Sequence, residues 1–211
     1  MKTVTIIDYG MSNLRSVSKA LEHVAGNDWI VNVTNEADAI LKADKVVFPG
    51  QGAIGNCMTL LNQTGITIAI KQVLINKPFL GICLGLQTLF TTSKESGGTA
   101  GLNCVAGTVQ HFVGPLTELH KNLKIPHMGW NQVQQMQSHP LWNGIADNSR
   151  FYFVHSYYVK PVQSNVIAGV TSYGNVDFTS AIARDNIFAV QFHPEKSQHA
   201  GLTLLKNFLK W

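Results

Sequence analysis

The sequence predicts an α/β fold with a central, mainly parallel β-sheet, helices on both faces, and an added antiparallel section in the second half. Short apolar runs without polar alternation, such as residues 4–7 and 46–48, are typical of strands buried on both faces of a parallel sheet. Stretches with helical spacing separate these runs, as in βαβ units. From Gly107 onward, strand-like runs follow one another across turns, which favours antiparallel pairing.

The first half alternates strands and helices in order. Expected strands cover residues 4–7, 30–33, 46–48 and the apolar run that ends at Cys83. Helices are expected over residues 13–25 and 66–75, after Ala53, and from 84 to 90. In the helix at 13–25, four apolar residues recur at helix spacing: Leu14, Val17, Leu21 and Val24.

The second half is expected to be mostly strand. Six runs, divided by turns, have the composition of strands: 107–112, 131–136, 150–159, 166–172, 179–184 and 187–191. The last stretch, 200–209, is amphipathic and should form a helix that docks on the core. We expect the antiparallel section to extend the same sheet, so that residues 1–211 form a single domain.

Composition excludes several classes of protein. The chain of 211 residues is 45% hydrophobic and 13% charged, which suits a globular domain. Its net charge of +4 comes from scattered lysines and arginines, so we expect no nucleic-acid partner. No apolar stretch has the length of a membrane span, and the start does not resemble a signal peptide. Three cysteines without a C-x-x-C pair fit a reducing cytoplasm, and we expect no metal or cofactor.

The pentapeptide Gly81-Ile82-Cys83-Leu84-Gly85 has the pattern of a nucleophile elbow, with cysteine at the nucleophile position. A tight turn from strand to helix crowds the backbone, and glycines two residues to either side leave the space it needs. The turn would place the sulfur at a helix N-terminus, which favours the reactive thiolate. For this pentapeptide alone, a buried cysteine packed as a small apolar residue is the alternative.

A base for this nucleophile is expected at His193. The apolar run 187–191 reads as a strand, and His193-Pro194-Glu195 follows at its end. Glu195 is close enough to hold the imidazole in one tautomer, as the third member of a catalytic triad does. Alone, these three residues also suit a surface turn. Their pairing with the elbow favours catalysis.

The third segment of interest is the loop at Gly50-Gln51-Gly52, which follows the apolar run 46–48. Acyl transfer to cysteine needs donors aimed at the developing oxyanion. The backbone N–H of Gln51 and that of Leu84 are the candidates. A phosphate-binding loop is a rival interpretation, but neither G-x-x-x-x-G-K-[ST] nor G-x-G-x-x-G occurs here. A plain turn without a binding role is the third interpretation of this loop.

With Cys83, His193 and Glu195 in this order, the chain resembles class I, triad-type glutamine amidotransferases, which have a flavodoxin-like fold. The stretches PHMGWN at 126–131 and YFVHSY at 152–157 are similar to the glutaminase subunits of imidazole glycerol phosphate synthases, enzymes of histidine biosynthesis. The segments 8–14 and 193–197 are similar as well. Two positions depart from the family pattern: Ser12, where glycine is frequent, and Gln51, where valine is common.

The resemblance implies a role for each matching residue. Cys83 would attack the side-chain amide of L-glutamine and form a thioester, His193 would move the protons, and Glu195 would hold His193. Gln87 would contact the substrate and Glu95 its α-ammonium group. The full set of substrate-binding positions that the resemblance implies is Gly50, Gly52, Gln87, Glu95, His155, Ser156 and Tyr157.

The resemblance also implies a partner. Ammonia would pass to a (β/α)8-barrel cyclase subunit in a heterodimer, because this chain has no second catalytic cluster for an acceptor. The positions expected near that interface are Asn13, Trp130, Tyr152 and Lys196. A further hypothesis is that the N–H of Gln51 points away from the oxyanion until the partner binds.

Three alternatives stay open on the sequence alone. The chain could be a glutaminase for another acceptor, such as anthranilate, a nucleotide, pyridoxal phosphate or a sugar in a paralogous pathway. It could be a cysteine peptidase or stress protein of similar fold, although His193 and Glu195 do not suit that class. It could also be a binding module that has lost its chemistry, which the intact Cys83, His193 and Glu195 argue against.

Overall fold

A parallel sheet forms the centre of the computed structural model, which describes residues 1–10, 14–112 and 123–211. Five parallel strands lie in the order β2, β1, β3, β4, β13. Their bounds are β2 (Trp29–Thr34), β1 (Lys2–Ile7), β3 (Lys45–Gly50), β4 (Phe79–Cys83) and β13 (Ile187–Val190). Because β3, β4 and β13 run side by side in one direction, their carboxyl ends meet at the same edge of the sheet.

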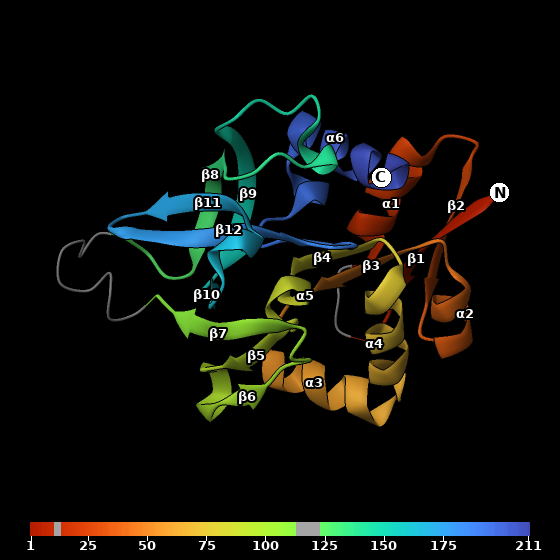
Figure 1. Cartoon of the computed structure of the whole chain (residues 1–211), viewed down its shortest axis with the longest axis horizontal. Helices are drawn as coiled ribbons and strands as arrows, with labels where there is room; N and C mark the ends of the chain where they lie inside the picture. The colour runs from red at the N-terminus through yellow and green to blue at the C-terminus, as the bar shows by residue number, and fades with distance from the viewer. Residues whose placement is uncertain (11–13, 113–122) are drawn as a thin grey trace.

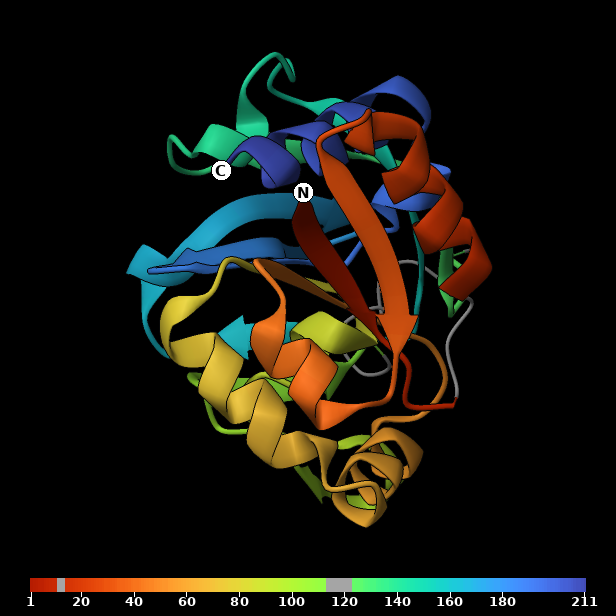
Figure 2. The same ribbon diagram turned by 90° about the vertical axis from the view of Figure 1, so that its right-hand side faces the viewer.

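Helices cover both faces of this parallel sheet (Figures 1 and 2). One face carries α1 and α6, and the other carries α2, α3 and α4. Alternate strand residues supply the two cores: Ile6 and Val47 face α1 and α6, whereas Ile7 and Val46 face the other three helices. The helix bounds are α1 (Leu14–Ala25), α2 (Ala37–Lys42), α3 (Ile54–Gln63), α4 (Ile66–Asn76) and α6 (Gln198–Lys210).

An antiparallel section continues the same sheet beyond β13 and contains a fork at β12. One branch runs from β12 through β10, β7, β5 and β6, and the other through β11, β8 and β9. In this section only the pair β5–β7, among the described residues, is parallel. The bounds are β5 (Phe90–Ser93), β6 (Thr99–Ala100), β7 (Val105–His111), β8 (His127–Gln135), β9 (Ser149–His155), β10 (Tyr157–Pro161), β11 (Ile167–Tyr173) and β12 (Val176–Arg184).

The predicted fold class is confirmed, and two element predictions are wrong. The helix expected over 84–90 is only the short α5 (Leu84–Gln87), because the chain turns after Thr88 and Phe90 pairs with Val105 in the sheet. The single strand expected over 150–159 is two strands. They break at Ser156 because the chain changes partners there: β9 pairs with β8, and β10 pairs with β7.

Among the α-helices and strands of the described residues, three were not predicted: α2, β5 and β6. The short helix α2 has one fully buried residue, Ile40, and packs beside α4, so its local apolar pattern is weak. Part of the helix predicted from residue 13 lies outside the described residues, which resume at Leu14. In the described part of the chain, no helix has the length and apolar character needed to cross a membrane.

Candidate active site

The elbow at Cys83 is the junction between β4 and α5, and its backbone is strained. Cys83 has φ 54° and ψ −105°, a conformation that side-chain-bearing residues adopt rarely and chiefly at functional sites. Gly85 is required sterically, since a Cβ there would overlap the carbonyl oxygen of Phe48. A Cβ at Gly81 would lie 2.9 Å from that of Ala189. The two glycines therefore allow the close packing that the turn needs.

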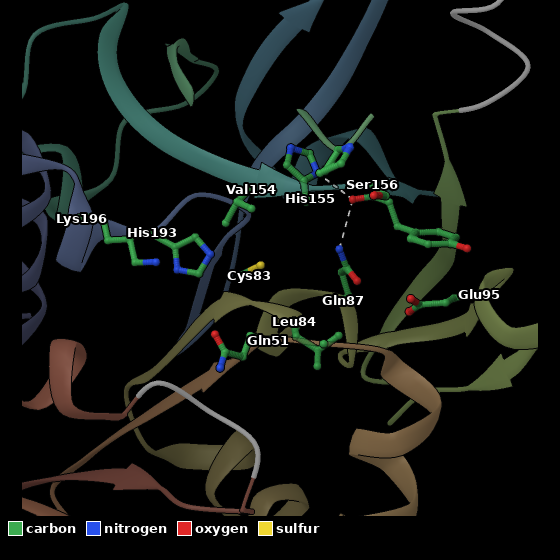
Figure 3. A pocket seen from close by; sticks show the side chains of 13 residues that line it. Gln51, Cys83, Leu84, Gln87, Glu95, Val154, His155, Ser156, His193 and Lys196 are labelled. Atoms are coloured by element: carbon green, nitrogen blue, oxygen red, sulfur yellow. Dashed lines mark hydrogen bonds between the residues drawn. The ribbon is translucent and has the colours of Figure 1, made fainter. Parts of the chain in front are cut away.

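The sheet brings His193 to Cys83. Strand β13 lies parallel to β4 with Val190 opposite Ile82, so the two chains leave the sheet side by side. His193 Nδ1 lies 2.8 Å from Glu195 Oε1, and the ring N–H donates to the carboxylate. The second ring nitrogen, Nε2, is buried, has no hydrogen-bond partner among the described residues, and faces the Cys83 sulfur (Figure 3). This is the order of groups in a nucleophile–base–acid triad.

The electrostatics of the site favour a charged imidazole. Burial alone would lower the pKa of His193, but the Coulombic attraction of Cys83 and the hydrogen bond to Glu195 outweigh burial. Together they raise the pKa of His193 from 6.5 to about 10. The side chain of Glu195 is only 4% exposed, so water does little to screen its charge from the ring. The arrangement stabilises the positively charged form of the His193 ring.

The loop with Gln51 leaves the sheet next to Cys83, because Gly50 at the end of β3 pairs with that residue. Gly50 itself is tightly enclosed: a Cβ there would lie 2.7 Å from the hydroxyl oxygen of Tyr9 and 2.8 Å from Leu84 Cβ. Both candidate oxyanion donors, Gln51 and Leu84, line the same cavity as Cys83. Their roles as donors stay predictions.

A cavity of about 290 Å³ opens over Cys83 and gathers most of the predicted site residues (Figure 3). Eleven of them line it: Gln51, Gly52, Cys83, Leu84, Gln87, Glu95, His155, Ser156, Tyr157, His193 and Lys196. Pro126 and Val154 line it too and were not singled out from the sequence as site residues. Gly50 and Glu195 instead line a smaller hollow behind His193. A cavity of this size and mixed polarity suits a small polar substrate.

Glu95 makes a hydrogen bond that sequence reasoning missed. Its Oε2 accepts a hydrogen bond of 2.9 Å from the backbone N–H of Ile54, the first residue of α3. The carboxylate therefore stabilises the positive end of that helix while it lines the cavity. The polar loop around Glu95 gave no signal for this contact, because α3 begins about forty residues earlier in the chain.

Three of the predicted interface residues form one cluster beside the cavity. The rings of Trp130 and Tyr152 are 6.1 Å apart, and the Lys196 ammonium lies 5.8 Å from the centre of the Tyr152 ring. Trp130 is 42% exposed and neighbouring Met128 is 61% exposed. The fourth, Asn13, lies outside the described residues. Among the residues that the structure describes, no group of three or more His, Cys, Asp or Glu side chains could hold a metal ion.

The chain belongs to the glutamine amidotransferase class-I family, whose model matches residues 5–211. The structure is similar to a crystal structure titled glutamine amidotransferase, with a TM-score of 0.72 and 14% identity over 98% of this chain and 97% of that one. It is also similar to a putative GMP synthase subunit from Thermoplasma acidophilum, with a TM-score of 0.71 and 19% identity over 100% and 93% of the two chains. At these low sequence identities, both similarities are evidence for the fold alone.

Relatives that match over nearly their full length give a more specific assignment. A protein from Hydrogenovibrio crunogenus is 54% identical over 100% of this chain and 97% of its own length. Another from Nitrosospira multiformis is 54% identical over 100% of this chain and 99% of its own. Both are named imidazole glycerol phosphate synthase subunit HisH. The sequence-based assignment to the glutamine amidotransferases is confirmed, and the peptidase and binding-module alternatives are not supported.

Proposed function

We propose that this glutamine amidotransferase is the glutaminase subunit of an imidazole glycerol phosphate synthase in cytoplasmic histidine biosynthesis. Its relatives at 54% identity are named as subunits of that synthase over nearly their full length. The observation that carries the proposal for the site is the geometry around Cys83: a strained elbow, an imidazole facing the sulfur, and a carboxylate 2.8 Å behind that imidazole.

In the proposed reaction, the Cys83 thiolate attacks the side-chain carbonyl carbon of L-glutamine. The N–H groups of Leu84 and Gln51 stabilise the oxyanion that forms. The His193 imidazolium gives its proton to the amide nitrogen, the C–N bond breaks, and ammonia leaves a glutamyl thioester. His193, now neutral, takes a proton from water, whose oxygen attacks the thioester. Glutamate leaves, and Cys83 and His193 return to the ion pair.

Substrate recognition in this proposal uses the cavity wall. Both side-chain N–H groups of Gln87 are occupied by protein acceptors, so its oxygen is left to accept from the substrate. Glu95 lines the cavity with a carboxylate that suits an α-ammonium group. The backbone around His155, Ser156 and Tyr157 would close the opposite wall.

The proposal requires a second subunit, since ammonia released to neutral water becomes ammonium and loses its nucleophilicity. We assign this role to a (β/α)8-barrel cyclase in a heterodimer. The exposed Trp130 and Met128, next to Tyr152 and Lys196, have the aromatic and methionine character of an interface anchor. In the proposal, docking of the partner also turns the N–H of Gln51 toward the oxyanion.

The test is glutamate production from glutamine by the chain alone and with the cyclase subunit. We expect the cyclase to bind and to raise the rate, and Cys83→Ala to lower kcat by at least about a thousandfold. Cys104→Ala, at a partly exposed cysteine outside the cavity, is the matched control and should keep full activity. Activity that survives Cys83→Ala would exclude the thioester mechanism. Failure of the cyclase to bind would favour a glutaminase for another acceptor.

A further inference from the structure

Gln191 touches the nucleophile and takes no part in the mechanism above. It follows β13 directly and its side chain is completely buried. Its Nε2 lies 3.6 Å from Cys83 Sγ, a distance within the range of hydrogen bonds to sulfur. The contact follows from the sheet, because Ile82 pairs with Val190 and the next residues on the two strands are Cys83 and Gln191.

The orientation of the Gln191 amide is fixed by its other neighbours. The carbonyl oxygen of Tyr157 can only accept, so the Gln87 group 3.1 Å from it must be the amide nitrogen (Figure 3). The second hydrogen of that nitrogen points at Gln191 Oε1, also 3.1 Å away. Once its oxygen accepts from Gln87, Gln191 has only its NH₂ group left for the sulfur.

The same chain of hydrogen bonds continues away from the cavity and has one direction. His155 Nδ1 lies 2.7 Å from the Tyr157 carbonyl oxygen and must donate to it, so Nε2 of the neutral ring is an acceptor. His127 Nδ1 lies 3.0 Å from that Nε2 and donates to it. Asn131 Nδ2, at 3.3 Å, then donates to His127 Nε2. Each group in the chain has one consistent role, which makes a flip of any member costly.

Burial keeps His127 and His155, the two histidines of this hydrogen-bonded chain, neutral. It lowers the pKa of His127 to about 4 and that of His155 to about 3, the latter with a smaller contribution from neighbouring His127 and His193. The two rings therefore keep these donor and acceptor roles at neutral pH, where the enzyme would work. The hydrogen-bonded chain connects the sulfur of Cys83 to β8, the strand that carries Trp130.

We propose that Gln191 is a further catalytic residue, whose side-chain amide donates a hydrogen bond to the Cys83 thiolate. The bond stabilises the thiolate and aims the sulfur at the cavity, and His155 and Gln87 are positioning residues that fix the amide's direction. The inference rests on the proposed function for the identity of the reaction. It does not depend on which acceptor receives the ammonia.

Other titratable groups lie near the site, and the test must separate their effects from that of Gln191. Those that line the cavity or interact with Cys83 electrostatically are Tyr9, Glu95, His155, Tyr157, His193 and Lys196. Substitution of Gln191 by methionine leaves all of these in place. It keeps the length of the side chain and removes only the amide.

The experiment is alkylation of Cys83 by iodoacetamide over a range of pH, read by mass spectrometry of the Cys83 peptide in the full chain. We expect Gln191→Met to move the pH midpoint of alkylation upward by roughly half to one unit, because a donor to the thiolate is lost. With glutamine, kcat should fall about tenfold while KM changes little. Gln72→Met, at an exposed position on α4, is the matched control and should change neither.

Gln191→Glu keeps the shape of the side chain and tests the same inference if Gln191→Met does not fold. Its carboxylate would repel the thiolate, so the midpoint should move further upward than in Gln191→Met. An unchanged alkylation profile in either folded variant would overturn the inference. Because alkylation needs neither glutamine nor a partner, a wrong acceptor assignment leaves this result unaffected.

Discussion

The two walls of the cavity are built in different ways. The first, the carboxyl edge of β3, β4 and β13, supplies Cys83, His193 and the loop at Gln51 from short motifs that each follow a buried parallel strand. The second consists of the facing ends of β9 and β10, which supply His155, Ser156 and Tyr157, together with the neighbouring strand β8, which side-chain hydrogen bonds connect to them. We call these the motif wall and the network wall.

Different physical effects hold the residues of the two walls in position. In the motif wall, steric exclusion fixes the backbone: glycines at 81 and 85 allow an approach that any Cβ would prevent. In the network wall, buried polar groups fix one another, and each must find a partner because unpaired burial is costly. Substitutions in the motif wall should therefore destabilise the protein through steric overlap. Substitutions in the network wall should destabilise it because hydrogen-bond partners are lost or become protonated.

The largest effect is expected from Gly85→Ala in the motif wall. The new Cβ would overlap the backbone of Phe48, which cannot move without disrupting β3, so the free energy of unfolding should fall by at least about 4 kcal/mol. Urea denaturation measures it. The matched control is Gly55→Ala in α3, where the nearest atom to a new Cβ is 3.5 Å away. That change should stabilise the protein by up to about 1 kcal/mol.

The network wall should be the more sensitive to acid. Burial lowers the pKa of His127 and His155 in the folded protein to about 4 and about 3, whereas the unfolded chain has histidines near 6.5. The unfolded state therefore binds more protons between these values, and stability is complete above pH 6.5 and falls as the pH drops toward 4. We expect a loss of about 2 to 3 kcal/mol from each of the two histidines as the pH falls to 4.5.

Urea midpoints measured from pH 7.5 to 4.5 test this expectation. His127→Asn should flatten the acid side of the curve, whereas His23→Asn, at an exposed position in α1, should leave it unchanged. A midpoint that stays constant down to pH 4.5 would contradict the assignment of neutral, buried histidines. So would an acid slope unaffected by the substitution at His127.

The smallest effect is expected at the outer face of the network wall. Trp130→Ala should weaken binding of the proposed cyclase by about tenfold or more, since a partly exposed tryptophan beside Met128 suits an interface anchor. Titration of the partner by calorimetry measures this. The isolated chain should keep its fold. Ile68→Ala, 67% exposed on α4 on another side of the molecule, is the control, and equal weakening by both variants would argue against an interface at Trp130.

The sequence predicted the motif wall well because its signals are local. The elbow at 81–85, the loop at 50–52 and the segment 193–195 each combine an apolar strand with a turn whose residue types have few other uses. Parallel strands then bring their ends together by topology alone. Short apolar runs and apolar residues at helix spacing likewise predicted most strands and the helices of both faces other than α2.

The network wall was predicted only through resemblance to a family, and its internal contacts were not predicted at all. The break at Ser156 depends on which strand pairs with which, and pairing over tens of residues leaves no local pattern. Gln191 looked like the last residue of an apolar strand. Its contact with the sulfur became visible only once β13 lay beside β4.

The amino-acid sequence was enough to predict the class of fold and to single out Cys83 and His193, since apolar periodicity and steric demands on glycine act over a few residues. The tertiary structure alone decided which way each buried amide and imidazole points. Hydrogen-bond direction depends on partners that are distant in the chain, and a donor or acceptor role is settled only when all of them are in place.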